Sequence, residues 1–264
     1  MKTHNKRAAL ATTLGLSVGL IASSQAATVL QSNDFGAGPD IGPALQQTTN
    51  SLGTGGSSDP STGVITTGAN NTSTYGFNSS GLVDVTSVAG ATGFTVEWVV
   101  TGISQNVDAI QSNDMFFGVT GNASTSTTGV PNLFNNSGNA IGIKLDVINL
   151  QSSFFEVGGA QNAQMPAGLT TASMEDGFII SFTVNDDNTW SATSTGLETE
   201  INSSGTLAQT TYAGIASGLG AYTSVQGNSV IYTVDNVTIT TVPEPSSAAL
   251  LGFGGLALVL RRRK

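Results

Sequence analysis

Short runs that alternate between apolar and polar residues recur along the middle of the chain. In GFTVEWVV, every second residue from Phe94 to Val100 is apolar, and FIISFTV (residues 178–184) alternates in the same way. A period of two is that of a β-strand with one buried face. NDDN (residues 185–188) separates the second run from TWSATS, which indicates a hairpin. The alternation predicts antiparallel sheets, each with one core face and one partly solvated face.

The remaining pattern favours an all-β, two-sheet antiparallel sandwich over residues 27–241. Further strands are expected at TYGFN, LVDVTS, MFFGVTG, AIGIKLDVIN and SSFFEVGG, and a flexible loop at residues 53–63. In VIYTVDNVTIT the apolar parity changes, which predicts a bulge near Asp235 and Asn236. The order of elements, with the TVNDDNTWSATSTG hairpin and the final VDNVTIT, resembles concanavalin A-like jelly rolls. An immunoglobulin-like sandwich is the alternative.

The first 26 residues are typical of an export signal. Lys2, Lys6 and Arg7 precede an apolar stretch, and small residues at Ser24 and Ala26 follow it. This order predicts a signal helix that is cleaved after Ala26, with an uncleaved membrane anchor as the alternative.

The chain ends in a Pro-Glu-Pro stretch, a short apolar run and a basic cluster. Pro243 and Pro245 cannot continue a helix, so Glu244 is expected in an extended, accessible segment just outside the membrane. The apolar run of residues 246–260 is shorter than the ~20 residues of a comfortable transmembrane helix. The cations after it would stay in the cytoplasm. This order predicts a C-terminal transmembrane helix that serves as a temporary anchor, with an ordinary tail anchor as the alternative.

The tail, residues 242–264, resembles a PEP-CTERM sorting signal, which exported bacterial proteins carry. The resemblance implies recognition by exosortase, a membrane transpeptidase-like protease, and cleavage near the Pro-Glu-Pro. It implies a Gram-negative-type envelope, frequently with exopolysaccharide or biofilm. The protein would be held transiently in the inner membrane and then reach the cell surface or extracellular matrix. The residues that carry the resemblance are Val242, Pro243, Glu244, Pro245, Arg261, Arg262, Arg263 and Lys264.

Charge and composition exclude several functions. The net charge is −9, and Lys144 is the only cation between residues 27 and 241, so this section would repel phosphate backbones and nucleic acid is not an expected partner. The sequence has no cysteine, and its one histidine, His4, lies in the predicted signal peptide. The mature chain therefore lacks the residues of Ser-His-Asp and Cys-His catalysis and of a zinc site built on His or Cys.

Carboxylate chemistry remains, in two forms. A glycosidase needs a close carboxyl pair, but Glu97, Glu198 and Glu200 are interpreted as solvated residues. Calcium, the one candidate cofactor, takes oxygen ligands from carboxylates and amide side chains. A hairpin turn is the alternative for residues 185–188. The candidate calcium ligands are Asp186, Asp187, Asn188 and Asp235.

Three functions stay open for residues 27–241. The first is a non-catalytic envelope or matrix protein, which we take as the main prediction, with no enzymatic activity. The second is a lectin-like module with a polysaccharide partner, and the third is a glycosidase. Four aromatic residues are candidates for stacking on sugar rings, although core positions are expected for them: Trp190, Tyr212, Tyr222 and Tyr232.

Overall fold

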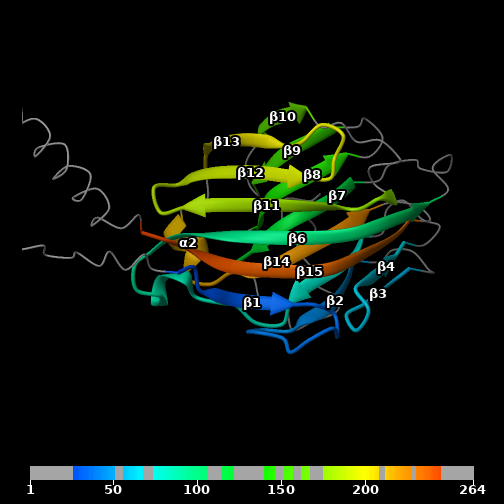
Figure 1. Cartoon of the computed structure of the whole chain (residues 1–264), viewed down its shortest axis with the longest axis horizontal. Coiled ribbons are helices and arrows are strands. Elements are labelled where there is room, and N and C mark those ends of the chain that lie inside the picture. The colour runs from blue at the N-terminus through cyan, green and yellow to red at the C-terminus, as the bar shows by residue number, and fades with distance from the viewer. Residues whose placement is uncertain are drawn as a thin grey trace, which may run out of the picture. The chain divides into compact units, whose positions relative to one another are not determined.

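The protein is an all-β sandwich of two antiparallel sheets (Figure 1). The computed structural model describes residues 26–50, 56–67, 74–105, 114–121, 140–146, 151–156, 162–166, 175–207, 212–226 and 230–244. The predicted fold class is confirmed, and Ala26–Glu244 form one compact unit. The predicted signal helix and transmembrane helix lie outside these residues. Within them, no helix is long and apolar enough to cross a membrane.

The first sheet has eight strands. Their order is β13 (Asn202–Thr206), β12 (Thr189–Thr195), β11 (Phe178–Asn185), β6 (Ala91–Gln105), β15 (Val230–Pro243), β4 (Val64–Thr66) and β3 (Ser57–Asp59). The eighth strand, β1 (Val29–Asn33), also pairs with β15. The alternation predicted from Phe94 to Val100 in β6 and along β11 is confirmed, because every second residue of these stretches is buried in the core.

The second sheet has seven strands. Their order is β10 (Asn162–Pro166), β9 (Gln151–Glu156), β8 (Ala140–Asp146), β7 (Asp114–Thr120), β14 (Gly220–Gln226), β5 (Thr74–Ser79) and β2 (Leu45–Asn50). A short helix, α2 (Tyr212–Ala216), precedes β14. Four of these strands, β5, β7, β8 and β9, lie where the sequence predicts them.

Two local features predicted from the sequence, a hairpin turn and a β-bulge, occur in the structure. Asn188 adopts a left-handed backbone, φ 64°, in the turn that joins β11 to β12. The register between β15 and β6 shifts around Asp235, which confirms the predicted bulge. The bulge turns Val234 and Val237 both into the core, where neither is exposed.

Two predictions were wrong in detail. LVDVTS is not a strand, because Asp84 accepts a hydrogen bond from the Thr86 amide (2.8 Å) and caps a 3₁₀ turn, η1 (Val85–Ser87). The loop expected at residues 53–63 contains β3 and its turn into β4. There the Asp59 carboxylate accepts a hydrogen bond from the Ser61 amide (2.9 Å) and closes the turn.

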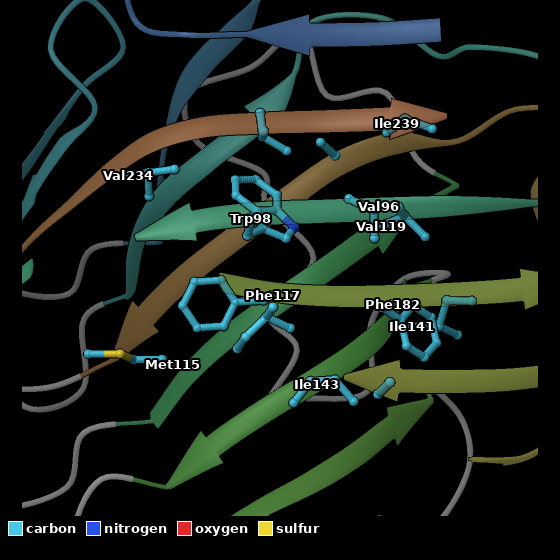
Figure 2. Close-up of a cluster of buried hydrophobic side chains, with 14 of the residues drawn as sticks. Val96, Trp98, Met115, Phe117, Val119, Ile141, Ile143, Phe182, Val234 and Ile239 are labelled. Carbon is cyan, nitrogen blue, oxygen red and sulfur yellow. The ribbon is translucent and has the colours of Figure 1, made fainter. Parts of the chain in front are cut away.

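Aromatic and branched side chains fill the space between the sheets (Figure 2). Trp98 on β6 packs against Phe117 on β7, with ring centroids 6.3 Å apart, and Trp190 stacks on Phe154 at 4.2 Å. One buried hydrogen bond of 2.7 Å joins the Tyr232 hydroxyl on β15 to the Thr223 hydroxyl on β14. The sheets are therefore fixed by packing and by a polar link across the core.

The last strand runs beyond the predicted domain boundary after Thr241. β15 continues through Val242 and Pro243, which pair with Gly93 and Ala91 of β6. The Glu244 amide then donates a hydrogen bond of 2.8 Å to the carbonyl of Gly90. The start of the Pro-Glu-Pro stretch is thus part of the sheet.

We expect residues 26–244 to fold alone with a β-type circular dichroism spectrum and a cooperative melt. A chain that ends at Thr241 should be less stable by about 1–3 kcal/mol, because it loses ladder hydrogen bonds worth about 0.5–1.5 kcal/mol each. Urea denaturation of both fragments measures the difference. Equal stability of the two fragments would show that residues 242–244 do not contribute to the sheet.

Candidate functional site

The four aromatic candidates are all buried in the structure. Trp190, Tyr212 and Tyr232 belong to the core between the sheets, as expected. Tyr222 differs, because it points to the other side of its strand and joins a separate cluster. The side chains around Tyr222 therefore define the candidate site.

One line of paired residues crosses the outer face of the seven-stranded sheet. Residues that pair directly in antiparallel strands point to the same face, so register alone places them side by side. We call this line the outer row. In order from β2 to β9 it contains Gln46, Asn78, Tyr222, Gly118, Gly142 and Phe155.

Three aromatic rings cluster on this face. Phe116 lies between Phe155 and Tyr222, with ring centroids 5.4 Å from the first and 5.6 Å from the second. With Ala140 they form a hydrophobic cluster distinct from the main core. The sheet therefore has apolar layers on both faces, although a sandwich requires only one.

Two glycines lie between Tyr222 and Phe155 in the outer row. Gly118 and Gly142 are paired between β7 and β8. A Cβ atom at Gly118 would clash with the carbonyl of Ile141, and one at Gly142 would clash with that of Phe117. Only glycine fits either position, so the aromatic rings lie beside a stretch of bare backbone.

Polar groups without partners lie at the β2 side of the outer row. Asn78 is only 1% exposed, and neither its amide nitrogen nor its oxygen has a hydrogen-bond partner. The Gln46 side-chain nitrogen is buried without a partner as well. Leaving a buried polar group unpaired costs about 1–3 kcal/mol. A group kept at that cost is one that a ligand or water would satisfy.

Half-exposed polar residues border the aromatic cluster. In the register row next to the outer row, Phe116 pairs with Lys144, and Lys144 pairs with Ser153. Asp146 lies two residues further along β8, on the same face. All three polar residues are partly exposed to solvent. The face thus combines a polar border, aromatic rings and unpaired amides.

The candidate calcium ligands are not brought together. Asp186, Asp187 and Asn188 lie in the β11–β12 turn, whereas Asp235 lies at the bulge of β15 beside Val99. The turn is anchored at Thr92, whose carbonyl accepts from the Asp186 amide (2.7 Å). Thr92 and Val99 are seven positions apart on β6, which is about 23 Å of strand.

The turn residues serve the turn itself. The Asp187 carboxylate accepts hydrogen bonds from the Thr189 amide (2.9 Å) and hydroxyl (2.6 Å), and these bonds lower the pKa of Asp187. The Asn188 side chain accepts from the Tyr212 amide at 2.6 Å. Among the described residues, no three or more His, Cys, Asp or Glu side chains lie together so that they could hold a metal ion. Calcium binding stays a prediction that the structure does not test.

The candidate glutamates occupy different environments. Glu97 lies on the outer face of the eight-stranded sheet and accepts a hydrogen bond from the Ser181 hydroxyl (2.9 Å). Beside it, the Thr95 and Thr183 hydroxyls bond to each other at 2.8 Å. Glu200 closes a turn by accepting from the Ser194 hydroxyl (2.7 Å), and Glu198 is exposed. Each has a structural or solvated position.

The processing residues are described only in part. Ala26, the predicted cleavage point of the signal, is exposed. Val242 and Pro243 are half-buried in β15, and Glu244 is exposed. The accessible segment predicted from the sequence thus begins only at Glu244. Pro245 and the basic cluster of residues 261–264 lie outside the described residues.

Comparison with known proteins finds a match for the tail and a fold likeness for the sandwich. Residues 241–264 match the PEP-CTERM protein-sorting motif. The sandwich is similar to arcelin-5, a lectin-like defence protein from Phaseolus vulgaris (TM-score 0.55, 10% identity, 83% of this chain and 100% of that chain). It is similar to lectin I from Ulex europaeus, solved with the methyl glycoside of α-L-fucose (0.55, 12%, 83% and 99%). No curated protein matches significantly. The expected jelly roll is confirmed, and the chain carries a PEP-CTERM sorting motif behind a β-sandwich whose fold is similar to that of these proteins.

Alkaline pH should unfold the domain through its buried tyrosines. Burial raises the pKa of Tyr222 and Tyr232 well above the ordinary value of 10.0. The unfolded chain ionises near that ordinary value, so stability is complete below pH 10 and falls above it, by about 1.4 kcal/mol per pH unit for each tyrosine. As the pH rises, the tyrosinate absorbance of Tyr222 and Tyr232 should increase in the same pH range in which the β-type circular dichroism signal is lost. Complete tyrosine ionisation in a domain that keeps its β signal would contradict this.

Proposed function

We propose that this chain is an exported, non-catalytic protein whose β-sandwich binds carbohydrate through the outer face of its seven-stranded sheet. The sorting motif indicates export, processing by exosortase and a C-terminal membrane-anchored stage. A protein sorted in this way works outside the inner membrane, at the cell surface or in the matrix, where polysaccharides are abundant partners.

The observation that carries the proposal is the unpaired amide of Asn78 beside an aromatic cluster. An amide side chain offers both donors and an acceptor, which match the hydroxyl groups of a sugar. Tyr222, the direct neighbour of Asn78 in the outer row, contacts Phe116. Aromatic rings provide an apolar surface for the C–H side of a sugar ring. The two chemistries that a sugar needs therefore lie side by side.

The polar border gives a ligand its first contacts. Lys144, Asp146 and Ser153 are partly exposed, whereas Asn78 and Tyr222 are buried. A chain of sugars would meet the border first and reach the outer row only when that row opens. This arrangement predicts slow association and a neutral, hydroxyl-rich ligand, since the border holds charges of both signs.

The likeness to lectins supports the fold behind this proposal and no more, because sequence identity is 10–12%. The Ulex europaeus lectin was solved with a fucose glycoside. In the present chain, Asn78, Tyr222 and Phe116 are the residues that support a sugar-binding face.

Replacing Asn78 with Leu should abolish or weaken glycan binding by about 10-fold or more, because two hydrogen bonds to the ligand are lost. The same change removes two unpaired buried groups, so the melting temperature should stay constant or rise. A glycan array with residues 26–244 identifies the ligand, and calorimetry with that glycan measures both variants.

Asn202→Leu is the matched control, because Asn202 is exposed on β13 of the other sheet. It should bind as the wild type does. Absence of any glycan binding by the wild type would refute the proposal. So would an Asn78→Leu domain that binds normally but melts at a lower temperature, since that would make Asn78 a structural residue.

We expect no hydrolase activity, because Glu97, Glu198 and Glu200 have the structural or solvated positions described above. Purified domain incubated with β-glucans and other polysaccharides should release no reducing sugar. Release that disappears in Glu97→Gln would overturn this prediction and favour the glycosidase alternative.

A further inference from the structure

The sorting motif begins inside the folded domain. Val242 and Pro243 are the last residues of β15 and pair with Gly93 and Ala91 of β6. The Glu244 amide donates to the Gly90 carbonyl at 2.8 Å. The motif is thus attached up to Pro243 to β6, and at Glu244 to Gly90, the residue before that strand.

Thr28, the residue before β1, holds the first residue of the motif, Thr241, from the other side. The Thr241 amide donates to the Thr28 carbonyl (2.9 Å), and the Thr28 amide donates to the Thr241 hydroxyl (2.9 Å). The Thr92 hydroxyl also donates to the Val242 carbonyl at 3.3 Å. Figure 1 shows the end of β15 between the starts of β1 and β6. We call these contacts the clasp.

The clasp limits where a protease can act. Peptides commonly bind other proteins as extended strands whose backbone groups pair with the partner. The backbone of residues 241–244 is already paired within the domain, so an enzyme can bind it in this way only after β15 detaches. Pro243 donates no hydrogen bond itself, and its register shift marks the end of regular pairing.

We propose that the folded domain protects the peptide bonds up to and including Pro243–Glu244, so that exosortase cuts on the C-terminal side of Glu244. The cut breaks one amide bond. The carbonyl carbon of the new end gains an oxygen from water, and the nitrogen of the released segment gains a proton. The mature protein keeps Val242, Pro243 and Glu244 as the end of β15. This inference does not depend on sugar binding.

Intact mass spectrometry of the processed protein, made from the full chain in a bacterium that has exosortase, tests the position of the cut. The expected mature C-terminus is Glu244 or a later residue. A mature end at Thr241, Val242 or Pro243 would overturn the proposal.

A second experiment separates protection by the fold from the enzyme's own preference. The full-length protein in detergent is treated with a proline-specific endoprotease, and cleavage after Pro243 is followed by mass spectrometry. The wild type should resist this cut. A Gly-Ser-Gly-Ser insertion between Thr241 and Val242 moves the motif out of the sheet, so this variant should be cut at least 10-fold faster.

The matched control carries the same insertion between Ser61 and Thr62, in the exposed turn between β3 and β4. It should resist cutting after Pro243 as the wild type does. Equal cutting of the wild type and the Thr241–Val242 insertion variant, whether fast or slow, would show that the clasp does not protect the motif.

Discussion

The pairing of β6 with β15 is the constraint on which the rest of the sandwich depends. These are the two longest strands in the described part of the chain, with 15 and 14 residues, and they lie at the centre of the eight-stranded sheet. β6 carries β11, β12 and β13 on one side, and β15 carries β4, β3 and β1 on the other. The bulge at Asp235 keeps both halves of β15 facing the core. The same pair also ends at the sorting motif, so folding and processing share one structural element.

The two faces of the seven-stranded sheet have different roles, stability for the inner face and proposed binding for the outer face. Its inner face packs against the first sheet, which is sufficient for folding. Its outer face adds the cluster around Phe116 and the unpaired amide of Asn78, neither of which the core requires. Buried polar groups without partners lower stability, so such a group is a candidate for a hydrogen bond to a ligand or to a bound water. This contrast is why the outer row, rather than the more exposed hydroxyl-rich face near Glu97, is the proposed site.

Sequence patterns predicted much of the fold because period-two alternation reports one buried face. They predicted β6, β11 and the hairpin at Asn188 well, since each of these strands has one buried face and one partly solvated face. The strands β1, β2 and β13 were missed, because VLQSN, LQQTTN and NSSGT are too polar to alternate visibly. LVDVTS alternates, but the local hydrogen bonds of Asp84 favour a turn over a strand.

The candidate site was missed for a different reason. Phe116 follows Met115 and precedes Phe117, and Phe155 follows Phe154. Such apolar runs are typical of strands buried on both faces, which could have indicated the second apolar layer. Asn78 gives no signal of its own, because its significance depends on the register that places Tyr222 beside it. Register between strands far apart in sequence is set by packing that no local pattern reports.

The most direct test of the central claim is nuclear magnetic resonance of the side-chain amide groups during glycan titration. The ¹⁵N-labelled domain, residues 26–244, is titrated with the glycan that the array selects. If sugar binds at the outer row, we expect the side-chain amide signals of Asn78 and Gln46 to shift on binding, while that of Asn202 stays unchanged. Binding that moves Asn202 or other signals of the eight-stranded sheet, and leaves Asn78 and Gln46 unaffected, would contradict it.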